Sequence, residues 1–323
     1  MSSQNPLVSI VFTSYNHKEF LKQALDSIVN QTYSNIEIIV VDDCSTDGSQ
    51  EILLQYKHLP NINLILSETN SGSYVNSTNL GATYAKGEYI LFAQCDDFAV
   101  SVQVEKLVEA MQNNPNVGVV YSKSNLVDEH GVKFLDDFKG RESQFKKHIK
   151  KTFFIEGSKM KDFLCFACVI PNLSAALIRL DLYKKVNGLS KKYLVVADWE
   201  FWLDLTEVTN FYYLPEPLNN FRQHGTTIRS SVKIKTQISE IFAMFYNHIA
   251  QYSLQSATKK KMQVGAGAVW FAYFFENKKL WFQSLTQTYK ELNSKYDSVL
   301  VSLILGFKKH CIEFFIRKFV KIS

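Results

Sequence analysis

The sequence contains no long hydrophobic run. None of its stretches approaches the roughly 20 consecutive apolar residues that a membrane-spanning helix needs, although 46% of its 323 residues are hydrophobic and 21% are charged. The first segment, Met1–Leu7, is short and polar, without a basic stretch that leads into an apolar one. We therefore expect a globular cytoplasmic protein that has no secretory signal.

Cysteine is scarce and its count is odd. The chain has five cysteines, which argues against a disulfide framework in a protein without a secretory signal. Cys165 and Cys168 form one Cys-x-x-Cys pair, but the sequence has no second pair and no suitably spaced histidines to complete a structural zinc site. Core thiols are the favoured interpretation, and a metal or redox role is the alternative.

Several common catalytic motifs are also missing. The sequence has no phosphate-binding Gly-x-x-x-x-Gly-Lys-Ser/Thr, no Gly-x-Gly-x-x-Gly after the first expected strand and no Gly-x-Ser-x-Gly. It also shows no internal repeat at the periods of solenoid proteins. These absences weigh against an NTPase, a dehydrogenase, a serine hydrolase and a repeat protein.

Positive charge is concentrated in the last part of the chain. Residues 231–323 carry 14 Lys and Arg against 5 Asp and Glu, a net charge of +9, whereas the whole chain has a net charge of +5. A basic C-terminal region favours an anionic partner, such as lipid headgroups, nucleic acid or a pyrophosphate-bearing acceptor.

Apolar runs of strand type alternate with helical patterns along the first half of the chain. The periodicity predicts strands at residues 7–12, 36–41, 62–66 and 89–93, with helical spacing after the first and second of them and around residues 77–85. Further along, it predicts a strand at 175–179 and a helix from about residue 198. Strands that alternate with helices indicate an α/β fold with a mostly parallel sheet and right-handed crossovers.

Polar clusters follow three of the predicted strands. They are Thr13–Asn16, Asp42–Asp47 and Gln94–Asp97. Because ligands of such sheets bind outside the carboxyl ends of the strands, we expect these clusters to converge in space and form the functional site.

Asp96 and Asp97 are the first candidates for chemistry. Adjacent carboxylates repel each other unless they share a cation, and divalent ions prefer carboxylate and phosphate oxygens. Ordinary turn formation is the alternative for an Asp-Asp pair at the end of a strand. Asp43 could accept hydrogen bonds from a nucleobase or ribose, or could cap the next helix, and Tyr15 could pack against a base.

Three residues in the second half are the next candidates. Asp198 begins a helix with a strongly aromatic face, where it could act as a general base or be a helix N-cap. Arg222 and His224 could neutralise a leaving diphosphate or complete a metal site, or simply be polar surface residues.

Taken together, these segments resemble the family 2 glycosyltransferases, which have the GT-A fold, a Rossmann-like sheet flanked by helices. The resemblance covers about residues 7–230 and rests on five segments: Val8–Ser49, Gly87–Asp97, Pro171–Arg179, Ala197–Leu205 and Phe221–Thr227. It implies an inverting, metal-dependent glycosyltransferase that transfers a sugar from a nucleotide diphosphate donor, commonly a UDP-sugar, to a hydroxyl of a glycan or lipid-linked acceptor in cell-surface polysaccharide synthesis.

The resemblance also implies roles for single residues. Thr13, Tyr15 and Asp43 would line the nucleoside pocket, and Asp96 would bind Mn²⁺ or Mg²⁺ that bridges the donor phosphates, with His224 as a further metal ligand. Asp198 would be the general base. Arg222 would contact the diphosphate, and Asp97 would support the metal or the donor sugar.

The chain departs from the family pattern at three positions. Gln94 replaces the Asp with which the strand-end motif often begins, Thr78 replaces the Arg that often precedes Asn79, and Ala197 replaces an acidic residue next to the expected base. These differences favour altered donor contacts. They also keep open a degenerate nucleotide- or glycan-binding module, and a nucleotidyltransferase is a less favoured alternative.

The sequence predicts two regions, a GT-A domain at 1–230 and a helical C-terminal region at 231–323. Near the end of the chain, Ile312, Phe315, Ile316 and Phe319 share a helical face after the apolar stretch at 299–307. Such a helix could lie on the cytoplasmic face of a membrane as a peripheral anchor, or pack on its own domain or on a second subunit of an oligomer. We expect no nucleic-acid partner.

Overall fold

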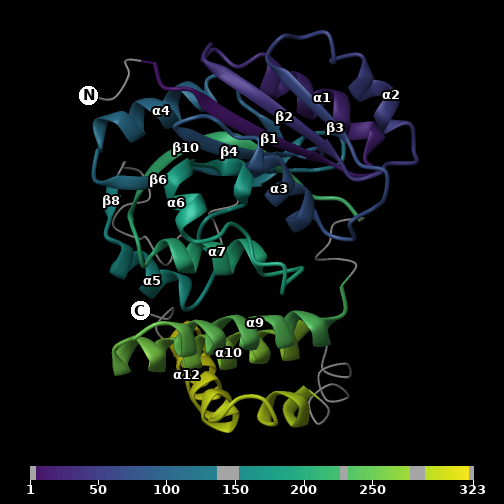
Figure 1. The fold of residues 1–323 in the computed structure, drawn as a ribbon. Helices are drawn as coiled ribbons and strands as arrows, with labels where there is room; N and C mark the ends of the chain where they lie inside the picture. The colour runs from purple at the N-terminus through teal and green to yellow at the C-terminus, as the bar shows by residue number, and fades with distance from the viewer. Residues whose placement is uncertain (1–4, 137–152, 226–231, 277–287, 320–323) are drawn as a thin grey trace. The chain divides into compact units, whose positions relative to one another are not determined.

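A computed structural model describes residues 5–136, 153–225, 232–276 and 288–319 (Figure 1). The chain divides into two compact units. The first comprises Met1–Met160 and Val169–Thr227, and the second comprises Lys161–Cys168 and Ile228–Ser323. The short segment 161–168 thus belongs to the second unit, which the hydrophobic pattern of the sequence did not indicate.

The first unit is built on a ten-stranded sheet with the order β3-β2-β1-β4-β9-β6-β10-β5, to which β7 adds beside β6 and β8 beside β10. The strands are β1 Val8–Ser14, β2 Ile36–Asp42, β3 Ile62–Leu66, β4 Tyr89–Gln94, β5 Phe98–Ala99, β6 Val117–Val127, β7 Lys133–Asp136, β8 Phe153–Ile155, β9 Ala176–Arg179 and β10 Asn210–Arg222.

The sheet is mixed. Strands β3, β2, β1 and β4 run parallel to one another, and β10 runs parallel to β6. Strand β9 joins the two parallel parts, because it pairs antiparallel with both β4 and β6. The α/β fold class expected from the sequence is confirmed, and the antiparallel pairs are a feature that hydrophobic periodicity does not encode.

The helices are α1 Lys18–Val29, α2 Ser49–Leu54, α3 Tyr74–Thr83, α4 Gln103–Asn113, α5 Gly157–Leu164, α6 Leu180–Lys185, α7 Ala197–Leu205, α9 Ile234–Gln251, α10 Ser256–Glu276 and α12 Val299–Phe319. Helices α1, α2 and α4 cover one face of the sheet, and α3, α6 and α7 cover the other (Figure 1).

Alternating side chains of the strands divide the core between these two faces. Ile10 and Leu91 point to the face where they pack in one cluster with α1, α2 and α4. The neighbouring residues Val11 and Phe92 point the other way. Val11 lies against Gly81 of α3, and the ring of Phe92 lies 5.3 Å from that of Tyr183 of α6. Burial on both faces explains why these strands read as continuous apolar runs.

Small residues allow two helices of the second unit to pack closely. A Cβ atom added at Gly267 of α10 or Gly306 of α12 would collide with the backbone of the other helix. The Tyr246 hydroxyl of α9 lies 2.9 Å from the Ser302 hydroxyl of α12, and the ring of Phe242 meets that of Trp270 edge-on at 5.3 Å. The helical C-terminal region thus has a core of its own.

In the described ranges, no helix combines the length and the apolar character that crossing a membrane requires. The face formed by Ile312, Phe315, Ile316 and Phe319 lies outside the side chains that the structure describes. All five cysteines lie in the described ranges, and none of them forms a disulfide bond. Cys165 is buried, and burial raises its pKa to about 12, so the group is a neutral thiol.

Candidate active site

The three polar clusters meet at the carboxyl ends of β1, β2 and β4, as the sequence predicted. The Asp43 backbone N–H donates to the Ser14 carbonyl at 2.9 Å, and the Cys95 N–H donates to the Thr13 carbonyl at 3.1 Å. The Asn16 N–H donates to the Ser45 hydroxyl at 2.9 Å. These bonds fix the three loops to one another at a single edge of the sheet.

Asp42 supports the loop that follows β2. Its fully buried carboxylate accepts hydrogen bonds from the Ser45 N–H at 2.9 Å, the Ser45 hydroxyl at 2.6 Å and the Gln50 amide at 2.9 Å. Cys44, which lies between Asp42 and Ser45 in the chain, adopts a left-handed backbone conformation with φ of 64°. That conformation costs a residue with a Cβ about 1–2 kcal/mol, and the bonds to Asp42 offset it.

The residues expected around a nucleoside lie in this part of the site. The Asp43 carboxylate is buried and accepts the Ser71 N–H and the Ser71 hydroxyl, each at 2.9 Å. A carboxylate has about four acceptor positions, so these two bonds leave room for a ligand. Thr13 is buried at the end of β1, and Tyr15 follows it with 44% of its surface exposed.

Asp96 and His224 form a close pair, although 128 residues separate them in the chain. His224 Nε2 lies 3.2 Å from Asp96 Oδ2, and the imidazole is almost fully buried, with 4% of its side chain exposed. Strand β10 brings them together because it pairs with β5, which directly follows the Asp96–Asp97 turn.

This pair suits a divalent cation that a ligand helps to coordinate. Within the described ranges, no group of three or more His, Cys, Asp and Glu side chains is arranged to hold a metal ion. One carboxylate oxygen and one imidazole nitrogen are suitable ligands for Mn²⁺ or Mg²⁺, and such ions take further ligands from substrate phosphates and water. The residues present therefore fit a metal whose coordination depends on the donor.

Asp97 points into the protein. Its carboxylate is buried and accepts hydrogen bonds from the Asn172 amide at 2.6 Å, the Ser174 hydroxyl at 3.0 Å and the Arg222 backbone N–H at 3.1 Å. Burial and the neighbouring charge of Asp96 raise the pKa of Asp97, and the hydrogen bonds from the Arg222 backbone and the Ser174 hydroxyl act in the opposite direction. Asp96 and Asp97 thus have different surroundings, although they are adjacent in the sequence.

Arg222 is also buried, with 1% of its surface exposed. Its guanidinium donates from Nε to the Asp96 carbonyl at 2.8 Å, from Nη1 to the Asp128 and Glu129 carbonyls at 3.3 and 2.6 Å, and from Nη2 to Gln23 Oε1 at 2.6 Å. Burial lowers the pKa of Arg222 from its ordinary value, and Asp97 and Asp96 oppose that shift.

Asp198 lies in the first turn of α7. The N-cap of this helix is Val196, so the N-cap alternative for Asp198 is wrong. Asp198 is half-buried, and its Oδ1 accepts the Trp199 N–H at 2.8 Å. A carboxylate in the first turn is stabilised by the helix dipole. The contacts described above connect Asp96, Asp97, Arg222 and His224, whereas Asp198 comes from a separate element.

Four residues around the site were not among the candidates. The His17 ring meets the His224 ring edge-on at 5.1 Å, and the Cys95 sulfur lies 3.6 Å from His17 Nδ1. Asn172 and Ser174 bind Asp97. Both belong to the segment Pro171–Arg179, which the sequence marks as a family motif, so the motif was a signal for them. His17 had no signal beyond its place after β1.

The three residues that depart from the family pattern lie in β4, α3 and α7. Gln94 is half-buried at the end of β4, and Thr78 is buried inside α3. Asn79 donates to the Leu189 carbonyl at 2.8 Å and accepts the Tyr183 hydroxyl at 2.6 Å, so it ties α3 to the chain that follows α6. Ala197 is fully buried.

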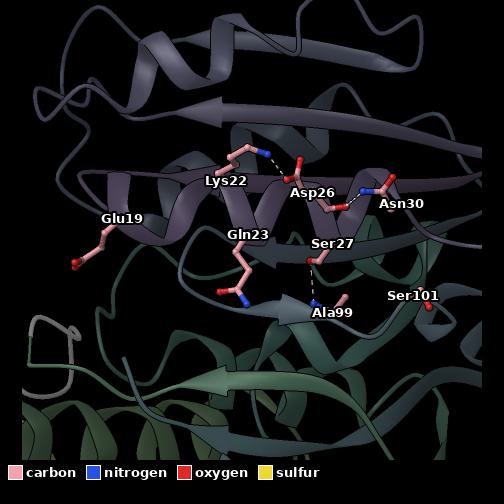
Figure 2. Close-up of a pocket in the computed structure, with 8 residues that line it drawn as sticks. All are labelled: Glu19, Lys22, Gln23, Asp26, Ser27, Asn30, Ala99 and Ser101. Carbon is pink, nitrogen blue, oxygen red and sulfur yellow. Dashed lines mark hydrogen bonds and ion pairs between the residues drawn. The ribbon is translucent and has the colours of Figure 1, made fainter. Parts of the chain in front are cut away.

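A pocket of about 650 Å³ lies beside α1 and is lined by the side chains shown in Figure 2. Its polar groups largely bind one another or the backbone. Lys22 pairs with Asp26, and the Ala99 N–H donates to the Ser27 hydroxyl at 3.0 Å. Gln23 points away from the Lys22–Asp26 pair (Figure 2), and its side chain oxygen accepts the hydrogen bond from Arg222.

Comparison with known proteins agrees with this geometry. The family model described as glycosyl transferase family 2 matches residues 9–168, which include β1, β2, β4 and the Asp96–Asp97 turn. The chain belongs to this family. It is therefore a glycosyltransferase, and its sheet and flanking helices have the GT-A fold.

Two relatives of this family 2 glycosyltransferase match different lengths of the chain. An uncharacterised glycosyltransferase of Haemophilus influenzae is 29% identical over 234 residues, which cover 71% of this chain and 72% of the relative. TuaG of Bacillus subtilis, whose name assigns it to teichuronic acid biosynthesis, is 37% identical over 112 residues, which cover 34% of this chain and 44% of TuaG.

Two solved structures have a similar fold. Residues 1–349 of Staphylococcus aureus TarS, in complex with UDP-GlcNAc, align with a TM-score of 0.67 and 18% identity over 96% of this chain and 91% of that one. The chain covers half of a longer TarS structure. The mannosyltransferase PcManGT of Pyrobaculum calidifontis, in complex with GDP-Man and Mn²⁺, aligns with a TM-score of 0.57 and 16% identity over 95% and 87%.

Proposed function

We propose that this glycosyltransferase transfers a sugar from a nucleotide diphosphate donor, a UDP-sugar in the first instance, to a hydroxyl group with inversion of configuration. The observation that carries the proposal is the distance of 3.2 Å between His224 Nε2 and Asp96 Oδ2, in the turn that follows β4. The donors in the two similar structures, UDP-GlcNAc and GDP-Man, support a nucleotide sugar as the donor class.

The nucleoside would bind at the ends of β1 and β2. Tyr15 offers an exposed ring against which a base can stack, and Asp43 has free acceptor positions for the base or ribose. Thr13 is buried near the end of β1 and would line the same pocket. The diphosphate would then lie toward β4, next to Asp96.

Asp96 and His224 would hold Mn²⁺ or Mg²⁺ together with the donor phosphates. When bound, the cation supplies positive charge that stabilises the departing diphosphate. The Mn²⁺ in the PcManGT complex supports a divalent cofactor for this fold.

Asp198 would act as the general base. Its carboxylate accepts the proton of the acceptor hydroxyl, whose oxygen then forms a bond to the anomeric carbon from the face opposite the diphosphate. The bond between the anomeric carbon and the phosphate oxygen breaks, and the electron pair leaves with the nucleoside diphosphate. A single displacement of this kind inverts the configuration.

The experiment is a metal-dependent assay of the purified chain with UDP-sugars and GDP-sugars, in which release of the nucleoside diphosphate is measured. We expect activity with Mn²⁺ or Mg²⁺, and a loss of about 100-fold or more in Asp96→Asn, since removal of one group that stabilises developing charge costs about 10²–10³ in kcat. Glu109→Gln, an exposed acid on α4, is the control. Activity that is equal in Asp96→Asn and the wild type would overturn the metal assignment.

The acceptor would be a glycan or lipid-linked glycan of a cell-surface polysaccharide. The similarity to TuaG supports this acceptor class. The excess of Lys and Arg after residue 230 supports a pyrophosphate-bearing acceptor or an anionic membrane surface.

We further propose that α12 makes peripheral contact with the cytoplasmic face of a membrane. Leu300, Val301, Ile304 and Phe307 are each 45% or more exposed and follow helical spacing, and Lys308 is exposed next to them. An apolar stripe beside basic residues suits a helix at a membrane interface.

Flotation with vesicles tests this contact. We expect the wild type to float with anionic vesicles and not with neutral ones, and Ile304→Glu to remain unbound. Asn293→Glu, which adds the same charge at an exposed polar position, should float as the wild type does. If Ile304→Glu forms a monomer while the wild type is an oligomer that ignores vesicles, the stripe is a subunit interface instead.

A further inference from the structure

Arg222 occupies the junction of four segments in the first unit. Its guanidinium donates to the turn after β4 at Asp96, to the turn after β6 at Asp128 and Glu129, and to Gln23 on α1. It is itself the last residue of β10. The elements that converge here lie far apart in the sequence, and a single side chain joins them.

The guanidinium is also enclosed by aromatic rings. Its central carbon lies 4.5 Å from the centre of the Phe20 ring and 5.3 Å from that of Phe98. Cation–π contacts strengthen when they are removed from water. With 1% of its surface exposed and four hydrogen bonds to protein oxygens, Arg222 is directed at the protein rather than at the ligand space.

Both members of the candidate metal pair depend on this residue. Nε of Arg222 binds the carbonyl of Asp96, and the backbone N–H of Arg222 binds the carboxylate of Asp97. His224 follows only two residues later in the chain. The position of Arg222 therefore fixes both the turn that carries Asp96 and the start of the segment that carries His224.

The turn is held from its other side as well. Asn172 donates to Asp97 at 2.6 Å and accepts a hydrogen bond from Asn219 at 3.3 Å, and Asn219 is buried on β10. Asp97 is thus a buried acceptor between Arg222 and Asn172. Through these hydrogen bonds to Asp97, β10 restrains the position of the turn after β4.

We propose that Arg222 is a positioning residue, which sets the geometry of Asp96 and His224 for the cation and makes no contact with the diphosphate. This inference rests on the proposed function. Gln23 completes it, because the Gln23 oxygen is the one side-chain acceptor among the four that hold the guanidinium. A lysine cannot reproduce these bonds, because its ammonium group lacks the planar arrangement of donors.

The test measures two affinities by isothermal titration for the wild type, Arg222→Lys and Gln23→Leu: that of UDP without metal, and that of Mn²⁺ in the presence of UDP. We expect Arg222→Lys to weaken Mn²⁺ binding about 10–100-fold, the usual effect of losing a group that orients a metal ligand. Gln23→Leu should weaken it in the same direction and by less. Metal-free UDP binding should stay within about twofold in both variants.

Matched controls separate this effect from a general one. One control is Arg179→Lys. The central guanidinium carbon of Arg179 lies 5.5 Å from the centre of the Tyr89 ring, and its Nε donates to the Val117 carbonyl, far from the site. Lys22→Leu makes the same apolar change next to Gln23. Both should bind Mn²⁺ as the wild type does.

Two results would overturn the proposal. One is metal-free UDP affinity that falls in Arg222→Lys while Gln23→Leu behaves as the wild type, which indicates direct contact with the diphosphate. The other is unchanged Mn²⁺ affinity in Gln23→Leu together with unchanged affinity or misfolding in Arg222→Lys.

A readout without ligand distinguishes this inference from the proposed function. The imidazole ¹⁵N resonances of His224 should shift in Gln23→Leu and stay unchanged in Lys22→Leu. If the wild type binds neither UDP nor Mn²⁺, the proposed function fails, and the His224 resonances still report whether the Gln23–Arg222 contact positions the pair. Unshifted resonances would overturn the positioning role itself.

Discussion

Asp198 and Asp96 have different roles in the proposed reaction, so substitution of each should affect different kinetic and binding constants. Asp198→Asn removes the base and leaves the donor site intact. We expect kcat for transfer to fall by about 100-fold or more, in line with the 10²–10⁴ that general-base catalysis contributes, while UDP affinity stays unchanged. Asp181→Asn, an exposed acid on α6, serves as the control. An Asp198→Asn enzyme with full transfer activity would assign the base to another residue.

Asn172 should matter for stability, because it binds a buried carboxylate. Asn172→Ala removes the donor at 2.6 Å from Asp97 Oδ2, which keeps only the Ser174 hydroxyl at 3.0 Å. The loss of a partner from a buried polar group costs about 1–3 kcal/mol. Urea unfolding measures it, with Asn113→Ala at the exposed end of α4 as the control. Equal stabilities of the two variants would contradict the importance of this network.

The sequence indicates some site residues and not others for a physical reason. Asp43 and Asp96 follow strands with clear apolar patterns, so strand-end geometry alone places them at the site. The contact between Asp96 and His224 depends on the pairing of β10 with β5, which no local pattern encodes. Arg222 shows most clearly what the sequence cannot indicate. Its charge suggests a contact with a ligand, whereas in the structure its buried guanidinium binds protein oxygens.

Among the elements, α3 packs on the sheet through Gly81. A Cβ at this position would collide with Val11 and lie 3.1 Å from Val41. Gly81→Ala should therefore destabilise the fold by about 1–3 kcal/mol, as overpacking does, although alanine favours a helix by about 1 kcal/mol. Thr83→Ala, exposed on the same helix, should stay within about 0.5 kcal/mol. A stabilising effect of Gly81→Ala in thermal unfolding would contradict this packing.

Helices α1 and α2 are linked through Tyr56, just after α2, whose hydroxyl donates to Asp26 of α1 at 2.6 Å. Burial and this bond raise the pKa of Tyr56 from 10 to about 12. Because the pKa of Tyr56 is higher in the folded state than in the unfolded state, the stability that the neutral hydroxyl contributes is complete below pH 10. It is lost as the pH rises toward 12. The stability advantage of the wild type over Tyr56→Phe should hold up to pH 10 and shrink above it. An advantage that is constant from pH 8 to 11.5 would contradict the assignment.

Most strands with apolar runs were predicted well, but β6 was missed although it begins with the buried run 117–121, and so were the short or irregular strands. The prediction for β3 at 62–66 agrees with the structure, and that for β4 is one residue short. Strand β10 escaped prediction because Pro215 and Pro217 interrupt its pattern, and its pairing with β6 has register shifts at these prolines. Its place in the sheet comes from long-range pairing.

For the whole molecule, the sequence predicted a boundary near residue 230, where the chain becomes basic and its hydrophobic pattern becomes helical. It could not indicate that 161–168 belongs to the second unit, since this assignment depends on contacts such as Cys165 with Gly265 of α10. The proposed donor site lies entirely within the first unit. The basic charge and the exposed stripe of α12 lie in the second, so donor chemistry and surface attachment are separable by mutation.

The strand-end site is proposed to bind a nucleoside diphosphate together with a divalent cation held by Asp96 and His224. Isothermal titration of the full chain with UDP and GDP, with and without Mn²⁺, tests it most directly. We expect Mn²⁺ to strengthen nucleotide binding in the wild type and not in Asp96→Asn. If neither nucleotide binds the wild-type chain, with or without Mn²⁺, the site does not have this function.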